Sequence, residues 1–406
     1  MTEKTAQARG NRLSVAFILT TLVIDAMGIG LIVPVMPDLI QEVQGTGIAN
    51  AALWGGLLAT TFAVFQFLFG PIVGGLSDRF GRRPVLIISM GIMALDYLVM
   101  AVAGSIWLLL AGRIVGGITA ATQSTAAAYM ADISRPEDKA KNFGLVGAAF
   151  GLGFVLGPLM GGLLGELGTR APFYAAAFLA ALNASLGYFV LKETVDDRIR
   201  RPFSLARANP FGAFKALGRL PGVGKLIAVY FIYQCAFMVY PAIWSYFSQE
   251  RFGWTPGMIG FSLALFGIML AIVQGGLIRF VLKWLGERGT VTYGLGFDFL
   301  AFVVLAFVTS GNVALALVPL AALAGVVTPA LQALMSKSVP DNAQGELQGA
   351  LTSVGAVASI LSFAIYPVIF AAFVQAEHFY LPGAPFLLSA LLTVLGLAVF
   401  FRVRLV

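Results

Sequence analysis

The sequence predicts an all-α membrane protein with twelve transmembrane helices in two six-helix bundles. Of its 406 residues, 59% are hydrophobic and only 11% are charged, so a water-soluble globule would lack the polar residues needed to cover its surface. The apolar runs reach about 20 residues, the length at which a helix crosses a hydrocarbon core. Basic residues gather at alternate ends of these runs, as expected for a chain that crosses a membrane repeatedly.

The individual helices are read from the apolar runs between charged or Pro/Gly-rich breaks. The first run follows a charged start and has no small-residue cleavage site behind a short apolar core, so we expect it to be retained and not removed as a signal peptide. The predicted helices cover residues 13–37, 53–76, 85–104, 105–130, 142–165, 172–191, 224–248, 257–282, 289–310, 312–335, 346–374 and 384–401.

The distribution of Lys and Arg predicts the orientation, because basic residues resist translocation. With the N-terminus in the cytoplasm, inner segments hold 23 of the 26 basic residues. The outer loops hold Arg170 and Arg251, and Arg113 lies inside a helix. We therefore expect both termini to be cytoplasmic. The net charge of +7 then belongs to the inner membrane surface, where the partner is anionic lipid and not nucleic acid.

A weak internal repeat divides the chain into halves. APFYAAAFLAALN at 171–183 recurs as APFLLSALLTVLG at 384–396, and FGRRPV at 80–85 has a counterpart, LGERGT, at 285–290. Chance similarity between apolar helices is the alternative for the first pair, but both pairs have nearly the same offset. Transporters built from parallel halves show such repeats.

The repeat and a long polar stretch between the halves predict the domain organisation. In the polar stretch, Phe211, Phe214, Leu217 and Leu220 share a helical face, which suggests a short helix on the inner leaflet. A linker that contacts only lipid is the interpretation we favour. The predicted parts are an N-terminal bundle at 1–191, a cytoplasmic linker at 192–223 and a C-terminal bundle at 224–406.

Four ionisable residues fall inside the predicted spans: Asp25, Asp96, Arg113 and Asp298. Each costs ~3 kcal/mol at the centre of a helix, so the four would cost roughly 10 kcal/mol if they faced lipid. They must therefore face an aqueous cavity or one another. For Asp25 and Arg113, a buried ion pair that only orients helices is the structural alternative.

Proton exchange is the chemistry that these acids offer. Desolvation favours the protonated form of a carboxyl group, so in a partly hydrated cavity its charge can switch with access or with a bound cation. A cationic substrate and a proton would then compete for one carboxylate, which is antiport. The driving force is adequate, because one pH unit is worth about 1.4 kcal/mol per proton and 100 mV about 2.3 kcal/mol per charge.

Other polar residues within the spans are candidates for substrate contact. Each of these amides by itself is expected to hold helices together, although together they could bind a polar ligand. They are Gln66, Asn183, Gln234, Gln274 and Gln332.

The sequence shows no pattern typical of an enzyme. It has one cysteine, Cys235, and one histidine, His378, and we find no nucleotide-binding loop, metal-ligand cluster or nucleophile arrangement. We therefore expect no catalytic residues, no bound metal and no cofactor.

The stretch GGLSDRFGRRPVL, residues 74–86, forms the predicted turn between the second and third helices. Gly81 supplies the tight bend. Asp78 lies at a helix C-terminus, where its charge opposes the helix dipole, so it needs a partner such as Arg82. A loop that merely fixes topology would not need this acid.

This loop closely resembles the signature loop of the major facilitator superfamily. The resemblance implies that Asp78, Arg79, Gly81, Arg82 and Arg83 belong to a latch that releases during the transport cycle. LLLAGRIVGGITAA at 108–121, which contains Arg113, is similar to the family's fourth-helix motif, whose arginine is associated with proton transfer.

A third stretch, GFVLGPLMGG at 153–162, resembles the fifth-helix motif of drug:proton antiporters. Gly153, Gly157 and Gly161 recur every four residues and permit close helix contact, and Pro158 is expected to bend the helix.

Within the superfamily, the sequence most resembles bacterial tetracycline efflux proteins. The resemblance rests on DAMGIGLIVPVMP (25–37), SDRFGRRPVL (77–86), ALDYL (94–98), ADISRPEDKAKNFGLVGAAFGLGFVLGP (131–158), ERFGWTPGMIGFSLA (250–264) and PALQALMS (329–336). It implies that Asp25, Asp96 and Asp298 are the family's transport aspartates. It also implies that the protein lies in the bacterial inner membrane and exports a tetracycline chelated to a divalent cation in exchange for a proton. We expect the protein to be monomeric.

One departure from that family concerns the eighth helix. Its members often carry a histidine at the position where FSLALFGIMLAIVQ (261–274) has Leu270. This difference leaves a multidrug or metabolite exporter of the same superfamily open as the alternative. A sensor or scaffold without transport is a further alternative, but it would have little use for costly buried charges.

Overall fold

The expected all-α architecture is confirmed for the part of the chain that the structure describes. This structure is a computed structural model, which describes residues 3–120, 122–195, 200, 202–204, 208–212, 223–340, 343–377 and 379–403. Every regular element in these residues is a helix. In the described ranges, eleven helical segments are long and apolar enough to cross a membrane. The predicted lipid-facing linker helix and His378 lie largely or wholly outside the described residues.

One of the eleven segments is long enough for two crossings. It runs from Pro256 to Phe307 over 52 residues, more than twice the ~20 that one span requires. Gly286 interrupts it with non-helical backbone, φ 64° and ψ 179°. The predicted helices at 257–282 and 289–310 both lie in this segment. The count of twelve spans and the cytoplasmic termini stay predictions.

The described chain forms two compact units. The first comprises residues 1–35 and 64–210, and the second comprises residues 36–63 and 211–406. Residues 36–63 precede most of the first unit in sequence yet have their contacts within the second. The domain boundaries read from the sequence stay a prediction.

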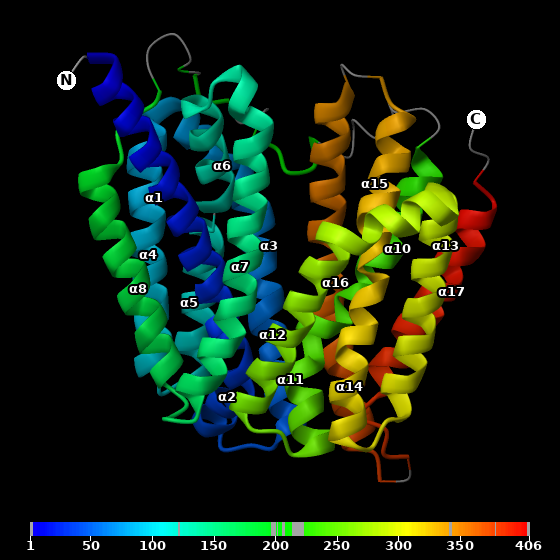
Figure 1. The fold of residues 1–406 in the computed structure, drawn as a ribbon. Helices are drawn as coiled ribbons and strands as arrows, with labels where there is room; N and C mark the ends of the chain where they lie inside the picture. Colours follow the sequence, from blue (N-terminus) through cyan, green and yellow to red (C-terminus); the bar gives the residue numbers. More distant parts are fainter. Residues whose placement is uncertain are drawn as a thin grey trace. The chain divides into compact units, whose positions relative to one another are not determined.

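The first unit is built around helices α1, α4, α7 and α8. The helix α1 lies along α7 and α8, and α4 packs between α8 and α5 (Figure 1). A core that includes Phe17, Leu22, Met90 and Tyr129 joins α1, α4 and α6. The elements are α1 (Glu3–Ile32), η1 (Val33–Val35), the second half of α3 (Ile48–Phe80), α4 (Arg82–Val102), α5 (Ile106–Thr119), α6 (Thr122–Ile133), η2 (Pro136–Asp138), α7 (Lys139–Gly165) and α8 (Ala171–Val190).

The second unit has its core between α10, α13, α15, α16 and α17. Leu295, Leu331, Leu351 and Phe400 are fully buried there. The elements are α2 (Met36–Gln44), the first half of α3, α10 (Gly224–Phe237), α11 (Val239–Phe252), α12 (Pro256–Ile272), η3 (Val273–Leu277, a π-helical turn), α13 (Ile278–Phe307), α14 (Gly311–Ala321), η4 (Ala322–Val326), α15 (Val327–Lys337), α16 (Gln344–Val374) and α17 (Ala384–Phe401).

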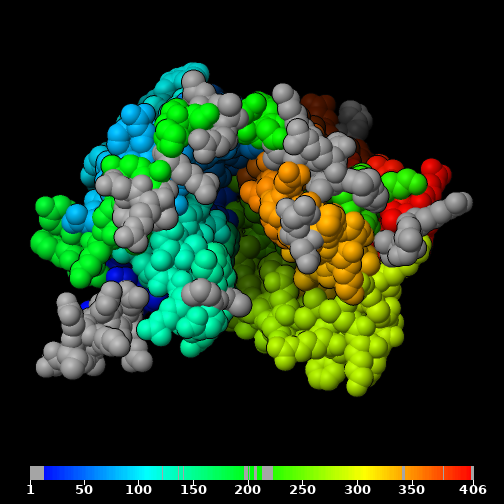
Figure 2. Space-filling model, turned by 90° about the horizontal axis from the view of Figure 1, so that it is seen from above, coloured from blue at the N-terminus to red at the C-terminus, as the bar shows by residue number. Residues whose placement is uncertain are grey.

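At one end of the second unit, α15 lies beside α13. Figure 2 shows this end as the orange surface of α15 next to the yellow-green surface of α13. Lys337 donates a hydrogen bond to Glu287 at 2.5 Å across this contact. Near α2, the amide of Gln249 on α11 donates to the Asp38 carboxylate at 2.6 Å, which ties α2 to α11.

Candidate functional site

A buried ion pair joins α4 to α5 in the first unit. The guanidinium of Arg113 donates a hydrogen bond to Oδ2 of Asp96, and the two side chains are only 9% and 3% exposed. A Cβ at position 112 would lie 2.6 Å from Asp96 Oδ1, so Gly112 leaves the space that the carboxylate occupies. Arg113 is therefore paired, but with Asp96 and not with Asp25, the acid considered from the sequence.

Asp25 lies on α1 in the same unit and is 7% exposed. The phenol of Tyr97, the residue after Asp96, interacts electrostatically with Asp25, Asp96 and Arg113. Tyr97 reaches α1 at Gly28, where a Cβ would lie 2.6 Å from the phenol oxygen. The structure thus gathers three of the four predicted charges around a tyrosine that the sequence did not single out. Its position directly after Asp96 in the stretch ALDYL was the available signal.

The glycine repeat of α7 positions the helix that carries Asp25. A Cβ at Gly157 would lie 2.6 Å from the Met27 carbonyl oxygen and 2.8 Å from the Cα of Gly30. Gly153 and Gly161 face the α1 backbone in the same way. Pro158 lies within the continuous helix and packs on Gly30, because a Cβ on Gly30 would lie 2.6 Å from Cδ of Pro158. The predicted close helix contact is confirmed, and it is made with α1.

Asp298 lies on α13 in the second unit and is 1% exposed. Neither of its carboxylate oxygens has a hydrogen-bond partner among the described residues. Tyr233 and Tyr240 are the phenols that interact with it electrostatically, and the buried hydroxyl of Tyr240 also has no partner in the described part of the chain. Asp298 is therefore a buried acid without a counterion within that part.

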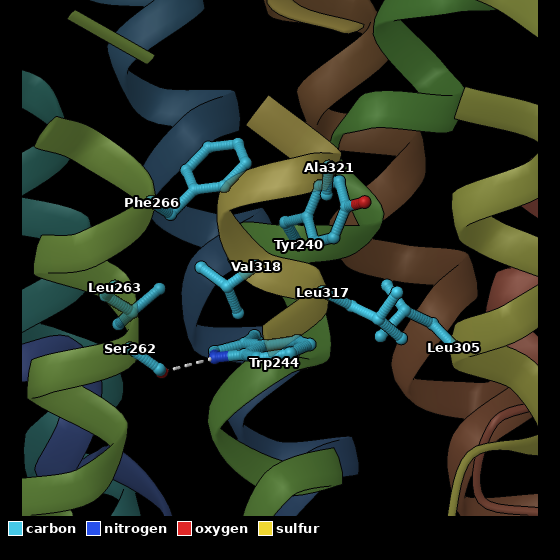
Figure 3. A pocket seen from close by; sticks show the side chains of 9 residues that line it. All are labelled: Tyr240, Trp244, Ser262, Leu263, Phe266, Leu305, Leu317, Val318 and Ala321. Atoms are coloured by element: carbon cyan, nitrogen blue, oxygen red, sulfur yellow. Dashed lines mark hydrogen bonds between the residues drawn. The ribbon is translucent and has the colours of Figure 1, made fainter. Parts of the chain in front are cut away.

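A small cavity next to these residues is bordered by Tyr240 (Figure 3). Its volume is about 30 Å³, and the side chains around it are mostly apolar. The Trp244 indole donates to the Ser262 hydroxyl at 2.9 Å, so these two polar groups satisfy each other. Pockets for drug-sized ligands measure roughly 300–1,000 Å³. This cavity alone is too small for such a ligand.

Leu270, at the position where related efflux proteins were expected to carry histidine, lies at the end of α12. Its side chain fills the space that a Cβ on Gly325 of η4 would need. One turn later, the Gln274 amide donates to the Gly325 carbonyl oxygen at 3.2 Å. This position is therefore an apolar packing contact between α12 and η4.

Two of the candidate polar residues connect elements of the first unit. Asn183 on α8 accepts a hydrogen bond from Thr21 on α1 at 3.2 Å and donates to the Met90 sulfur on α4 at 3.0 Å. Gln66 donates to the Ala120 carbonyl oxygen at 3.4 Å. Both contacts hold elements together, which is the role that each amide alone was expected to have.

The remaining candidates lie in the second unit. Gln332 on α15 shares a hydrogen bond with Tyr230 on α10. Gln234 on α10 faces α16, with its amide nitrogen 3.8 Å from where a Cβ on Gly355 would be. Contact of these amides with a substrate stays a prediction.

The loop between α3 and α4 turns at Gly81, whose φ of 112° lies in the region that favours glycine. Asp78 has the expected partner, because the Arg82 guanidinium pairs with it. Arg82 also donates to Asp132 on α6 at 3.3 Å, and Arg83 donates to the Tyr188 carbonyl oxygen at 2.7 Å.

Glu193, which follows α8, holds the same turn from the other side. Its carboxylate accepts from the backbone N–H groups of Arg82 at 2.9 Å and Arg83 at 3.3 Å, at the N-terminus of α4. A carboxylate stabilises that end of a helix. Arg79 stacks over the Phe80 ring at 5.1 Å. Asp132 and Glu193 were not predicted, although both belong to polar stretches next to predicted helix ends.

No group of three or more His, Cys, Asp or Glu side chains that could hold a metal ion occurs in the part of the chain that the structure describes. The ionisable side chains near Asp25 and Asp298 are single acids, phenols and one arginine. Such a set can exchange protons and attract a cation.

Comparison with known proteins gives consistent matches along the chain. Residues 18–363 match the family described as the Major Facilitator Superfamily. The chain is 43% identical to the class C tetracycline resistance protein of Escherichia coli, over 87% of this chain and 89% of that protein. It is 39% identical to the class G tetracycline resistance protein of Vibrio anguillarum, over 83% of this chain and 85% of that protein.

Solved structures support the same fold. The crystal structure of the human organic anion transporter MFSD10 (TETRAN) superimposes with a TM-score of 0.71 and 24% sequence identity. The match covers 97% of this chain and 99% of that chain.

Proposed function

Because this chain belongs to the major facilitator superfamily, a family of membrane transporters and not of enzymes, we propose that it is a proton-coupled exporter of a tetracycline-type drug. The transported species would be the drug chelated to a divalent cation, which carries a positive charge. Protons entering the cell would drive its export by alternating access. The divalent cation is part of the substrate, and the protein needs no resident cofactor.

The observation that carries this proposal is the set of buried acids within the spans. Asp298 has no hydrogen-bond partner in the described residues, and Asp25 lies at a buried phenol beside the Asp96–Arg113 pair. Unpaired acids at such depth are costly and are found where transport sites need them. An acid that is neutral when protonated can attract a cationic drug once the proton leaves, so proton and drug binding exclude each other.

The names of the similar proteins support the choice of drug. Proteins named for resistance to tetracycline match most of this chain, and two of the three intramembrane aspartates, Asp25 and Asp96, lie in the stretches that carry the resemblance. We place the protein in the inner membrane of a bacterium, as a monomer with both termini in the cytoplasm. The latch at Asp78 and Arg82 would open and close as the transport site becomes accessible to one side of the membrane and then to the other.

Inverted membrane vesicles with an acidic interior test the proposal. Adding tetracycline with magnesium should release protons through the wild-type protein, whereas vesicles without the protein should show no release. Asp25→Asn, which keeps the size of the side chain, should abolish the release. Normal exchange by this variant would exclude the coupling role of Asp25.

A second candidate is a multidrug or metabolite exporter of the same superfamily, favoured by Leu270. An apolar packing contact stands where a titratable histidine was expected, so the drug specificity can differ. Proton release by unrelated lipophilic cations, and not by tetracycline with magnesium, would favour this candidate. Absence of release with every compound would instead point to a sensor or scaffold.

A further inference from the structure

Tyr97 lies at the centre of the charged cluster in the first unit, on α4 and only 3% exposed. Its neighbour in sequence, Asp96, points to α5, where Arg113 holds it. Tyr97 points instead to α1, because its phenol oxygen occupies the space beside Gly28. Residues 25 and 28 are one turn apart on α1, so they share a side of that helix. The charged and titratable groups that act on the phenol are Asp25, Asp96 and Arg113.

We propose that Tyr97 is a positioning residue that connects Asp25 on α1 to the Asp96–Arg113 ion pair between α4 and α5. The proposal rests on the proton exchange proposed above for Asp25. The structure has no hydrogen bond between the Tyr97 phenol and Asp25; the phenol would donate one to the carboxylate when Asp25 is ionised, and this bond would weaken once Asp25 takes up a proton. The phenol thereby reports the charge of Asp25 to the ion pair one residue away.

The chemistry of a phenol suits this role. A tyrosine hydroxyl keeps its proton at neutral pH and can both donate and accept a hydrogen bond. Hydrogen bonds to a charged acceptor are roughly twice as strong as neutral ones, so the donor favours the ionised state of its partner. A phenylalanine has the same ring and lacks only this donor.

Gly28 provides a second, independent way to disturb the phenol. A methyl group at this position would meet the phenol oxygen at 2.6 Å and two ring carbons at 3.1 Å, so the ring must move. Gly91, on the same helix as Tyr97, is the matched control, because a Cβ there has no atom within 4 Å. Tyr174 on α8, 49% exposed, is the matched control for removing a hydroxyl.

The experiment is an infrared pH titration of the purified full-length protein in lipid nanodiscs. The carbonyl stretch of a protonated carboxyl group reports its protonation without any substrate, and the band that Asp25→Asn removes belongs to Asp25. Tyr97→Phe should move the midpoint of this band to higher pH by about one unit, a change of about 1.4 kcal/mol, because the ionised form loses a donor. Gly28→Ala should move it in the same direction. Gly91→Ala and Tyr174→Phe should leave it in place.

A Tyr97→Phe protein that titrates with the wild-type midpoint would overturn the proposal. If Tyr97→Phe fails to elute as a folded monodisperse protein, the Gly28→Ala midpoint decides in its place, and a wild-type midpoint there overturns the proposal equally. Drug-induced proton release is measured separately in vesicles. If the wild type releases no protons on drug addition but Tyr97→Phe still shifts the Asp25 band, the proposed function fails and the role of Tyr97 stands. If the wild type releases protons but Tyr97→Phe leaves the Asp25 band in place, the proposed function stands and the role of Tyr97 fails.

Discussion

Replacing Asp96 with asparagine should destabilise the protein, although the change is nearly isosteric. The Arg113 side chain would stay buried without the carboxylate that faces it. Removing one partner of a buried ion pair costs about 3–5 kcal/mol. We expect the lower end, about 3 kcal/mol, because Asp96 uses only one oxygen for a hydrogen bond within the described residues and Arg113 has further interactions. A free energy of this size lowers the ratio of folded to unfolded protein more than 100-fold.

Asp298→Asn is the matched control for this prediction. Asp298 is even more deeply buried, but its oxygens accept no hydrogen bond in the described part of the chain, so the variant removes a desolvation cost and breaks no hydrogen bond there. Its stability should equal or exceed that of the wild type.

The assay is thermal unfolding in detergent, followed by the loss of the monodisperse peak in size-exclusion chromatography. Asp96→Asn should melt well below the wild type, and Asp96→Asn combined with Arg113→Leu should recover most of the loss, because the double variant leaves no unpaired arginine buried at this position. Equal melting temperatures for Asp96→Asn and Asp298→Asn would refute the assignment of Asp96 and Asp298 to different environments.

Three further predictions concern packing and the ends of the helices. Gly157→Leu should separate α7 from α1 and reduce the yield of folded protein in membrane fractions several-fold. Gly151→Ala should not reduce it, because a Cβ at position 151 has no atom within 4 Å. Equal yields for the two variants would contradict the close contact between α7 and α1. Glu193→Gln should remove about 0.5 kcal/mol of stabilisation at the N-terminus of α4 and so lower the melting temperature slightly. An unchanged melting temperature in low salt would argue against stabilisation of this helix end by Glu193. Gln249→Glu should replace the amide that donates to Asp38 with a second carboxyl group and lower the melting temperature, because the hydrogen bond between α2 and α11 is lost. A melting temperature equal to or above that of the wild type would contradict this contact.

The all-helical architecture and the burial of the charged residues could be predicted from the sequence. A run of about 20 apolar residues has few alternatives to a membrane helix, and an acid inside it must be buried within the protein. The same reasoning applies to the glycine repeat of α7, because a small-residue face only makes sense against another helix.

The partners of the buried groups could not be predicted in this way. Arg113 could have paired with Asp25 or Asp96, and the choice depends on Gly112, which opens the space between α4 and α5. Tyr97 was missed because its importance comes from its reach to α1, which no spacing along α4 reveals.

Contacts between distant segments were equally invisible. Glu193 reaches the backbone of Arg82 across 111 positions of sequence, and residues 36–63 have their contacts in the second unit although they precede most of the first. Sequence patterns describe one helix at a time, whereas these contacts follow from how helices pack.

The central claim is that one set of intramembrane carboxylates binds either a proton or a cationic drug. Calorimetric titration of the purified protein with tetracycline and magnesium, repeated in two buffers of different ionisation enthalpy, counts the protons released on binding. We predict net proton release by the wild type and none by a protein carrying both Asp25→Asn and Asp298→Asn. Drug binding to the wild type without any release of protons would contradict the claim.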